Sequence, residues 1–249
     1  MMFEEPFRWM EAISTRHSYV QEKLKKGQPV LAVPCQKGAL VMGFTAQPGK
    51  IFEVYDRIAL GSLGHPADVE RLRMTLLDMA HLEGFNRSDK DVTIARLLQF
   101  GIAPAMKQNF EEVMRAPYLV KLLFAEIDFD NRPVFFRLNY DGHWETFTKG
   151  AVISGNDKES DWIQKQIEQT DFASMPLEQA LKEACRLWEE GKKEVAPKAE
   201  DADETPVTLA DAFDQWTLEA AVLSTETQRK ALYRVVTHDE IEPLKPTAQ

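Results

Sequence analysis

Two cysteines and one lysine are the side chains of this sequence whose surroundings could support chemistry. Cys35 ends an apolar run, and as a nucleophile it would need a histidine base, for which His65 is the candidate. Nothing in the neighbouring sequence supports that pair, so we predict that Cys35 is a small packed residue. Cys185 falls on the apolar face of a predicted helix and is expected in the core. Lys50 begins the run IFEVY, where its ammonium group could either hold a carboxylate or be a solvated charge at a strand end.

The other polar residues do not form a recognisable metal, cofactor or phosphate site. His81, His143 and His238 have no metal-ligand spacing, so no metal is predicted. The segment 61–64, Gly-Ser-Leu-Gly, is too short and too apolar for a phosphate-binding loop. We therefore expect no cofactor.

The composition is that of an ordinary soluble globular protein. The chain has 249 residues, of which 44% are hydrophobic, and a net charge of −10 without a basic stripe, which argues against nucleic acid as a partner. No apolar run reaches the ~18 residues that a membrane span needs. Two distant cysteines indicate a reducing compartment, and the acidic amino-terminal segment is unlike a secretory signal. These features predict a cytoplasmic protein in which residues 1–249 form one domain.

A leading helix is predicted over residues 7–26. Its apolar residues recur at steps of about three or four, the period of an amphipathic helix, and they include Phe7, Met10, Ile13 and Val20. Gly27 is placed to end it. Such a helix either packs on its own domain or docks on neighbouring subunits, and both can hold at once.

The remaining elements follow from hydrophobic periodicity and from turn and capping residues. Strands are expected at 30–34, 39–44, 50–55, 57–60, 118–127, 134–139, 144–147, 151–154, 217–223 and 231–237. Helices are expected at 66–84, 88–114 with a break near Pro104, 157–170, 176–190 capped by Ser174, and after a capping box at Thr237. Residues 194–206 hold five acids and read as a mobile acidic insertion. Paired helices between blocks of strands predict an α+β fold, with two antiparallel sheets sandwiched between helix layers.

The order of elements from Gly27 to Leu72 resembles the core of proteasome subunits, which belong to the N-terminal-nucleophile hydrolases. It runs strand, turn, strand, a third strand led by lysine (Lys50-Ile51-Phe52-Glu53-Val54), strand and helix. Asp91-Val92-Thr93, the segment 115–123 and Tyr140-Asp141-Gly142 also fit this family. The leading helix makes the bacterial α-type subunits the best match. The resemblance implies a four-layer αββα sandwich.

Catalytic members of that family begin their first strand with a threonine, serine or cysteine whose free amine acts as the base. Here residues 1–27 precede the matching position, which is Gln28. The aspartate that supports the family's lysine corresponds to Phe44, while the lysine itself is kept as Lys50. An amide cannot be the nucleophile and a phenyl ring cannot orient an ammonium, so the resemblance implies a non-catalytic subunit of a threonine-type endopeptidase complex.

The resemblance also implies partners and the residues that would bind them. An α-type subunit forms a ring, seven-membered in the family, templates a ring of β subunits and receives a ring-shaped ATPase. Lys50, with Gly64 and His65, would hold the carboxyl terminus of that activator. Residues 1–6 would be a flexible tail whose Met1, Met2 and Phe3 gate the pore. The subunit interface would include Phe7, Met10, Ile13 and Val20.

Some features depart from the family, and two other functions stay open. The Tyr-Asp-Arg gate motif of archaeal and eukaryotic α subunits is absent near the amino terminus, and no family counterpart is assigned to residues 194–206. One alternative is a free-standing hydrolase on the same fold with an unrecognised nucleophile. The other is a standalone binding protein that has lost the ring.

Overall fold

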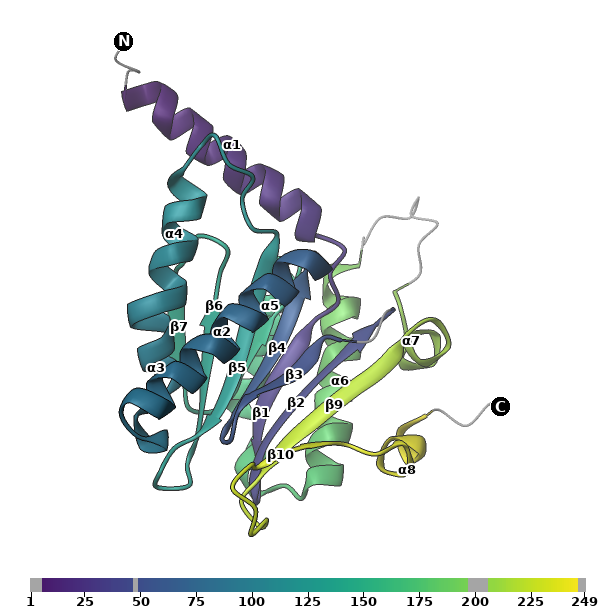
Figure 1. Cartoon of the computed structure of the whole chain (residues 1–249). Coiled ribbons are helices and arrows are strands. Elements are labelled where there is room, and N and C mark those ends of the chain that lie inside the picture. The colour runs from purple at the N-terminus through teal and green to yellow at the C-terminus, as the bar shows by residue number, and fades with distance from the viewer. Residues whose placement is uncertain (1–5, 47–48, 197–205, 246–249) are drawn as a thin grey trace.

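Two five-stranded antiparallel sheets form the centre of the molecule (Figure 1). The computed structural model describes residues 6–46, 49–196 and 206–245. The first sheet has the order β10-β9-β2-β1-β8 and the second has the order β3-β4-β5-β6-β7. The strands are β1 (Val30–Cys35), β2 (Gly38–Thr45), β3 (Ile51–Tyr55), β4 (Ile58–Gly64), β5 (Val120–Ile127), β6 (Pro133–Leu138), β7 (Trp144–Phe147), β8 (Ala151–Ile153), β9 (Thr217–Ser224) and β10 (Tyr233–Val235).

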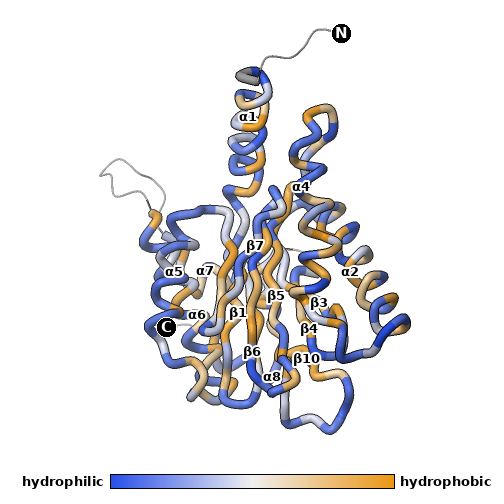
Figure 2. The backbone as a smooth tube through the Cα atoms, turned by 90° about the vertical axis from the view of Figure 1, so that its left-hand side faces the viewer, coloured by the Kyte–Doolittle hydropathy of each residue, from blue (hydrophilic) through white to orange (hydrophobic). Residues whose placement is uncertain are grey.

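Helices cover the outer face of each sheet, which gives the expected four-layer αββα arrangement. The first sheet is covered by α5 (Asp157–Gln169), α6 (Leu177–Val195) and α7 (Leu209–Gln215), with the short α8 (His238–Ile241) nearby. The second sheet is covered by α2 (Pro66–Asn86), α3 (Ile94–Leu97) and α4 (Ala103–Glu111). The longer of these helices flank the sheets in the two views (Figures 1 and 2).

Alternating side chains divide the strands between three cores. In β1, Leu31 and Val33 pack under α5 and α6, whereas Val30 and Ala32 face the second sheet. Because successive strand residues point to opposite faces, each strand serves one helix layer and the layer between the sheets. Full burial of each large apolar side chain stabilises the fold by roughly 1.5–3 kcal/mol.

Helix α1 (Pro6–Leu24) lies across one end of the sandwich and extends beyond the sheets (Figures 1 and 2). Val20 and Leu24 belong to the core between the sheets. The guanidinium group of Arg16 is buried and donates hydrogen bonds to the carbonyl oxygens of Phe110 (2.9 Å), Val113 (3.3 Å), Arg115 (2.7 Å) and Asn109 (3.1 Å). The last turn of a helix lacks intrahelical partners for its carbonyl groups. Arg16 therefore caps α4 and fixes α1 against it.

Several boundaries differ from the expectation. Strand β8, which the order of strands along the chain would place next to β7, pairs with β1 in the first sheet, and Gly150 just before it has a positive φ. Gly84 lies inside α2 rather than ending it, and the lack of a side chain there makes room for the Tyr55 hydroxyl. The cap of α6 is Pro176, not Ser174, because Ser174 belongs to a preceding 3₁₀ turn.

The segment expected as one helix over 88–114 is divided. A 3₁₀ turn at Asp89–Asp91 precedes α3, and a π turn at Leu98–Ile102 joins α3 to α4. Pro104 has no N–H to donate to a carbonyl one turn earlier, and the N–H of Ala103 donates to the oxygen of Leu98 instead. The predicted break is therefore confirmed, as a π turn just before the proline.

The sequence did not predict α7, and the acidic insertion was predicted to begin too early. Seven residues are too few for a clear helical period, although Thr208 and Asp211 form a capping box at its start. Glu194 and Val195 continue α6. Residues 197–205 and the tail residues 1–5 lie outside the described part of the chain. Among the described helices, none has the length and apolarity needed to cross a membrane.

Glu126 provides a prediction for the pH dependence of stability. Its carboxylate is buried in β5 and accepts a hydrogen bond from the N–H of Ile94 at 3.0 Å, at the start of α3. Burial raises the pKa of Glu126 to about 7, with a smaller contribution from Asp128 in the same direction. The folded pKa lies above the unfolded one, so the stabilisation is complete below the unfolded pKa and is lost as pH rises through about 7.

Glu126→Gln should therefore be neutral at about pH 4 and stabilising by about 3 kcal/mol at about pH 8. Glutamine stays uncharged and keeps an oxygen for the Ile94 N–H. Urea denaturation of both proteins at the two pH values measures the difference, and an equal difference at both would contradict the assignment.

Candidate functional site

A pocket of about 970 Å³ lies at the end of the sheets next to α1. Its walls come from the segment between α1 and β1, the end of β2, the residues just before β3, the β4–α2 junction, α6 and the segment around α7. Four lysines line it, Lys25, Lys26, Lys50 and Lys192, and none of its described lining residues is acidic. In a chain with a net charge of −10, this local excess of cations favours an anionic ligand.

Lys50 is held inside this pocket by two main-chain carbonyl groups. Its Nζ donates to the oxygen of Gln28 at 2.7 Å and to that of Phe44 at 3.0 Å. The pKa of Lys50 is lowered to about 7, mainly by burial and also by the nearby charge of Lys192, whereas Glu219 and Glu159 act in the opposite direction. Lys50 is therefore no ordinary solvated surface lysine.

Glu219 positions the backbone that carries Lys50. Its carboxylate accepts hydrogen bonds from the N–H groups of Gly49 (2.7 Å), Lys50 (2.8 Å) and Ile51 (3.1 Å). Glu219 comes from β9, which is far along the chain. Glu219 was not predicted from the sequence, although a lone acid in the otherwise uncharged strand TLEAAVLS was a signal for it.

The two positions that matched catalytic residues both contact Lys50 through their main chain. Gln28 lies just before β1 and Phe44 near the end of β2, and both offer main-chain oxygens to Lys50. The Phe44 ring is buried, 4.6 Å from the Trp188 ring and 5.2 Å from that of Phe213. The Phe44 side chain thus belongs to an aromatic cluster, at the position where the family resemblance implies a carboxylate in a catalytic subunit.

Gly64 and His65 form the junction between β4 and α2, beside the pocket that holds Lys50. Gly64 lines the pocket and has a φ of +142°, and a Cβ there would come within 2.0 Å of the oxygen of Leu119. Only glycine fits such an approach. The N–H of His65 donates to that same oxygen at 2.8 Å. Its Nδ1 accepts from the N–H of Ala67 at 3.3 Å, so the side chain caps α2 rather than reaching a ligand.

The cysteines do not form a second site. Cys35 is buried at the end of β1 opposite Gln28, so it lies away from the His65 junction, and burial raises its thiol pKa. Cys185 is buried in the core under α6, where burial raises its pKa to about 12. Both are packed residues, as expected. No cluster of three or more metal-ligating side chains occurs among the residues that the structure describes.

The structure describes three of the predicted interface residues, whereas the predicted gate residues lie outside the described part of the chain. Met1, Met2 and Phe3, and the side chain of Phe7, lie outside the described part of the chain. Met10 is 62% exposed on α1, and Ile13 is partly buried. Val20 is 0% exposed because it packs into the chain's own core. Val20 is therefore a core residue, and its assignment to a contact with a partner was wrong.

The comparisons with known proteins agree with this architecture. The family model "Proteasome subunit" matches residues 24–203, well over half of the chain. The chain belongs to the proteasome subunit family. The fold is that family's sandwich of two antiparallel sheets between helices, and the resemblance found in the sequence is confirmed.

Curated relatives specify the type of subunit. A proteasome subunit alpha of Acidothermus cellulolyticus is 28% identical over 241 residues, which cover 96% of each chain. That of Jonesia denitrificans is 26% identical with 95% of each chain covered, and that of Arthrobacter sp. is 28% identical with 94% covered. The similarity to these bacterial α subunits extends beyond residues 24–203, the part that the family model matches. This protein is an α-type member, a class that is generally non-catalytic.

Proposed function

We propose that this chain is a structural ring subunit of a bacterial proteasome core particle. In this role it scaffolds catalytic β subunits and docks a ring-shaped ATPase at the Lys50 pocket. The observation that carries the proposal is Lys50 itself, which is kept at the position of the family's active-site lysine while the other two catalytic positions hold Gln28 and Phe44. In the cytoplasm, such a particle would degrade proteins delivered by the ATPase.

The pocket's chemistry supports docking rather than peptide hydrolysis by this chain. A hydroxyl or thiol with a free amine is needed for nucleophilic attack, and Gln28 supplies an amide side chain on an internal residue. A desolvated ammonium, by contrast, binds a carboxylate through a charge-assisted hydrogen bond stronger than that of a surface pair. Gly64 borders the space that such a carboxylate would enter, and His65 follows it as the cap of α2.

Exposed apolar side chains support assembly with other subunits. Trp9 and Met10 on α1 are largely exposed, and a second group is formed by Leu82 and Phe85 of α2 with Phe100 of the π turn. Phe85 is 89% exposed. Apolar side chains gathered on two separate surfaces are typical of contact sites for other chains. We assign α1 to ring and β-subunit contacts, and Met1, Met2 and Phe3 ahead of it to the gate.

The pKa of Lys50 gives a testable pH dependence for docking. Only the ammonium form binds a carboxylate, and the pKa of Lys50 in the unoccupied pocket is about 7. Raising the pH through this value deprotonates Lys50, so a peptide with a free C-terminal carboxylate should bind on the order of tenfold more weakly at about pH 8.5 than at about pH 6.5. Titration calorimetry at both pH values checks this. Lys50→Arg keeps the charge and should flatten the profile.

Mass measurement of the intact assembly tests the proposed function as a whole. The chain is co-expressed with a threonine-headed candidate β subunit and purified under native conditions. We expect stacked rings that contain both chains and cleave small peptides. Peptide hydrolysis by this chain alone, labelled by a covalent threonine-protease inhibitor, would instead indicate a free-standing hydrolase. A chain that remains a monomer with its partner present would indicate a standalone binding protein.

A further inference from the structure

A second lysine faces the docking pocket from a different element. Lys192 belongs to the last turns of α6, lines the same pocket as Lys50 and has a side chain that is 16% exposed. Its Nζ lies 5.5 Å from the centre of the Trp188 ring, which packs against the ring of Phe44. Two ammonium groups therefore approach one space from two sides.

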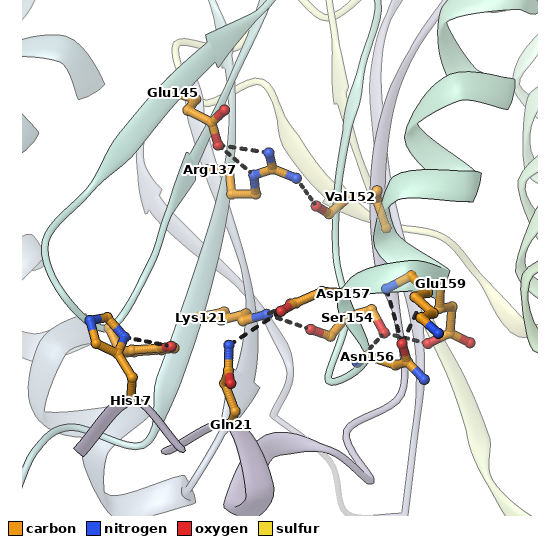
Figure 3. A network of polar contacts seen from close by, with 12 residues as sticks. His17, Gln21, Lys121, Arg137, Glu145, Val152, Ser154, Asn156, Asp157 and Glu159 are labelled. Atoms are coloured by element: carbon orange, nitrogen blue, oxygen red, sulfur yellow. Dashed lines mark hydrogen bonds and ion pairs between the residues drawn. The ribbon is translucent and has the colours of Figure 1, made fainter. Parts of the chain in front are cut away.

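Lys192 forms an ion pair with a buried carboxylate, and a hydrogen bond holds that carboxylate in place. Glu159 of α5 is 1% exposed, and its Oε1 lies 3.0 Å from the Nζ of Lys192. Its Oε2 accepts a hydrogen bond from the hydroxyl of Ser154. Figure 3 shows Ser154 and Glu159 beside Lys121 and Asp157, in a network that reaches Gln21 of α1. The carboxylate is thus held in place, whereas the lysine has a flexible stem.

The described residues that line the pocket carry more positive charge than one bound carboxylate would neutralise. After burial, the charge of Lys192 is the largest cause of the lowered pKa of Lys50, so the two ammonium groups repel each other. None of the described lining residues is acidic. A single ligand carboxylate on Lys50 would leave Lys192 with only Glu159. Because an ammonium has three donors, Lys192 can keep Glu159 and still donate to a ligand.

We propose that Lys192 binds a second carboxylate, so that the pocket selects C-terminal peptides whose last residue is aspartate or glutamate. Such a residue carries two carboxylates close together, one for each lysine, and Val207 and Trp216 offer apolar wall to the preceding residues. This specificity rests on the proposed docking function of the pocket. Lys192 would be a specificity-determining residue and Lys50 the anchor of the terminal carboxylate.

Four short peptides test this. They share one sequence except for the last residue, which is glutamate or glutamine, and each is made with a free and with an amidated C-terminus. Binding to the intact protein is measured by calorimetry. We expect the free-acid glutamate peptide to bind on the order of tenfold more tightly than the glutamine peptide, as one charge-assisted hydrogen bond provides. Equal binding of these two peptides by the unchanged protein would overturn the proposal.

Two variants should change the affinity in opposite directions. Lys192→Gln should abolish the preference for glutamate while the free acid still binds more tightly than the amide. Glu159→Gln removes the competing charge, so the glutamate peptide should bind severalfold more tightly. Misfolding could not produce that gain. Lys182→Gln, on the exposed face of α6, is the matched control and should change nothing.

A third variant and the amidated peptides separate the possible failures. Lys192→Gln with Glu159→Gln leaves no unpaired buried charge and should also lose the preference. If the preference persists without Lys192, the proposal is wrong. If amidation has no effect on binding to the unchanged protein, the anchoring role of Lys50 is wrong, whether or not Lys192 recognises the acidic side chain.

Discussion

Lys50→Ala is expected to abolish ATPase-stimulated protein degradation while the particle still assembles and cleaves small peptides through its β subunits. The ammonium is the group that would hold the activator's terminal carboxylate, and losing one such desolvated contact removes on the order of 3 kcal/mol, or more than a hundredfold in affinity. Degradation of a folded protein and hydrolysis of a fluorogenic peptide, measured on the same particles, separate the two effects.

Lys182→Ala serves as the matched control, since Lys182 is exposed on α6 away from the pocket lining. It should leave both activities unchanged. Stimulated degradation that persists in Lys50→Ala particles would show that Lys50 is not the docking lysine. Loss of peptide hydrolysis as well would point to a structural role in assembly instead.

Arg16→Met is expected to cause the largest loss of stability, about 3 kcal/mol, because a charged donor group satisfies four main-chain carbonyl groups there. Methionine fills a similar volume but donates no hydrogen bond, so carbonyl groups in the last turn of α4 and just after it lose their partner. The free energy of unfolding from urea denaturation measures the loss. Faster proteolysis within α1 should accompany it, since the helix loses its attachment.

Arg8→Met makes the same substitution on the exposed part of α1 and should change stability by less than about 0.5 kcal/mol. If both variants unfold at the same urea concentration, the Arg16 hydrogen bonds contribute nothing net. Weaker ring assembly in Arg16→Met than in Arg8→Met would link the attachment of α1 to its proposed interface role.

Most strands could be predicted because their apolar runs are long and turn residues separate them. The turn at Tyr140-Asp141-Gly142 is an example, since Gly142 adopts the positive φ that this turn needs. The capping box of Thr237 and Glu240 is likewise present as predicted. Local chemistry of this kind acts over a few residues and can be read from them. The short α7 and the π turn before Pro104 could not be predicted in this way, because packing against neighbouring elements determines whether such short elements form.

The candidate site was only partly visible in the sequence. Lys50 and Gly64 were identified through the family resemblance, and both line one pocket. Glu219 and Lys192 were missed because each reaches Lys50 from a distant segment, and no local spacing records such a meeting. Val20 was assigned to an interface because periodicity shows that one helix face is apolar. It cannot show whether that face meets the chain's own core or another chain.

The sequence by itself determined the fold class, the order of elements and the replacement of two catalytic side chains by Gln28 and Phe44. Each of these depends on residue type and near neighbours. Only the tertiary structure decided that β8 joins the first sheet, that carbonyl groups surround the ammonium of Lys50, and that Glu219 and Lys192 lie beside it. These facts depend on burial and on pairing between distant segments, which exist only once the chain has packed.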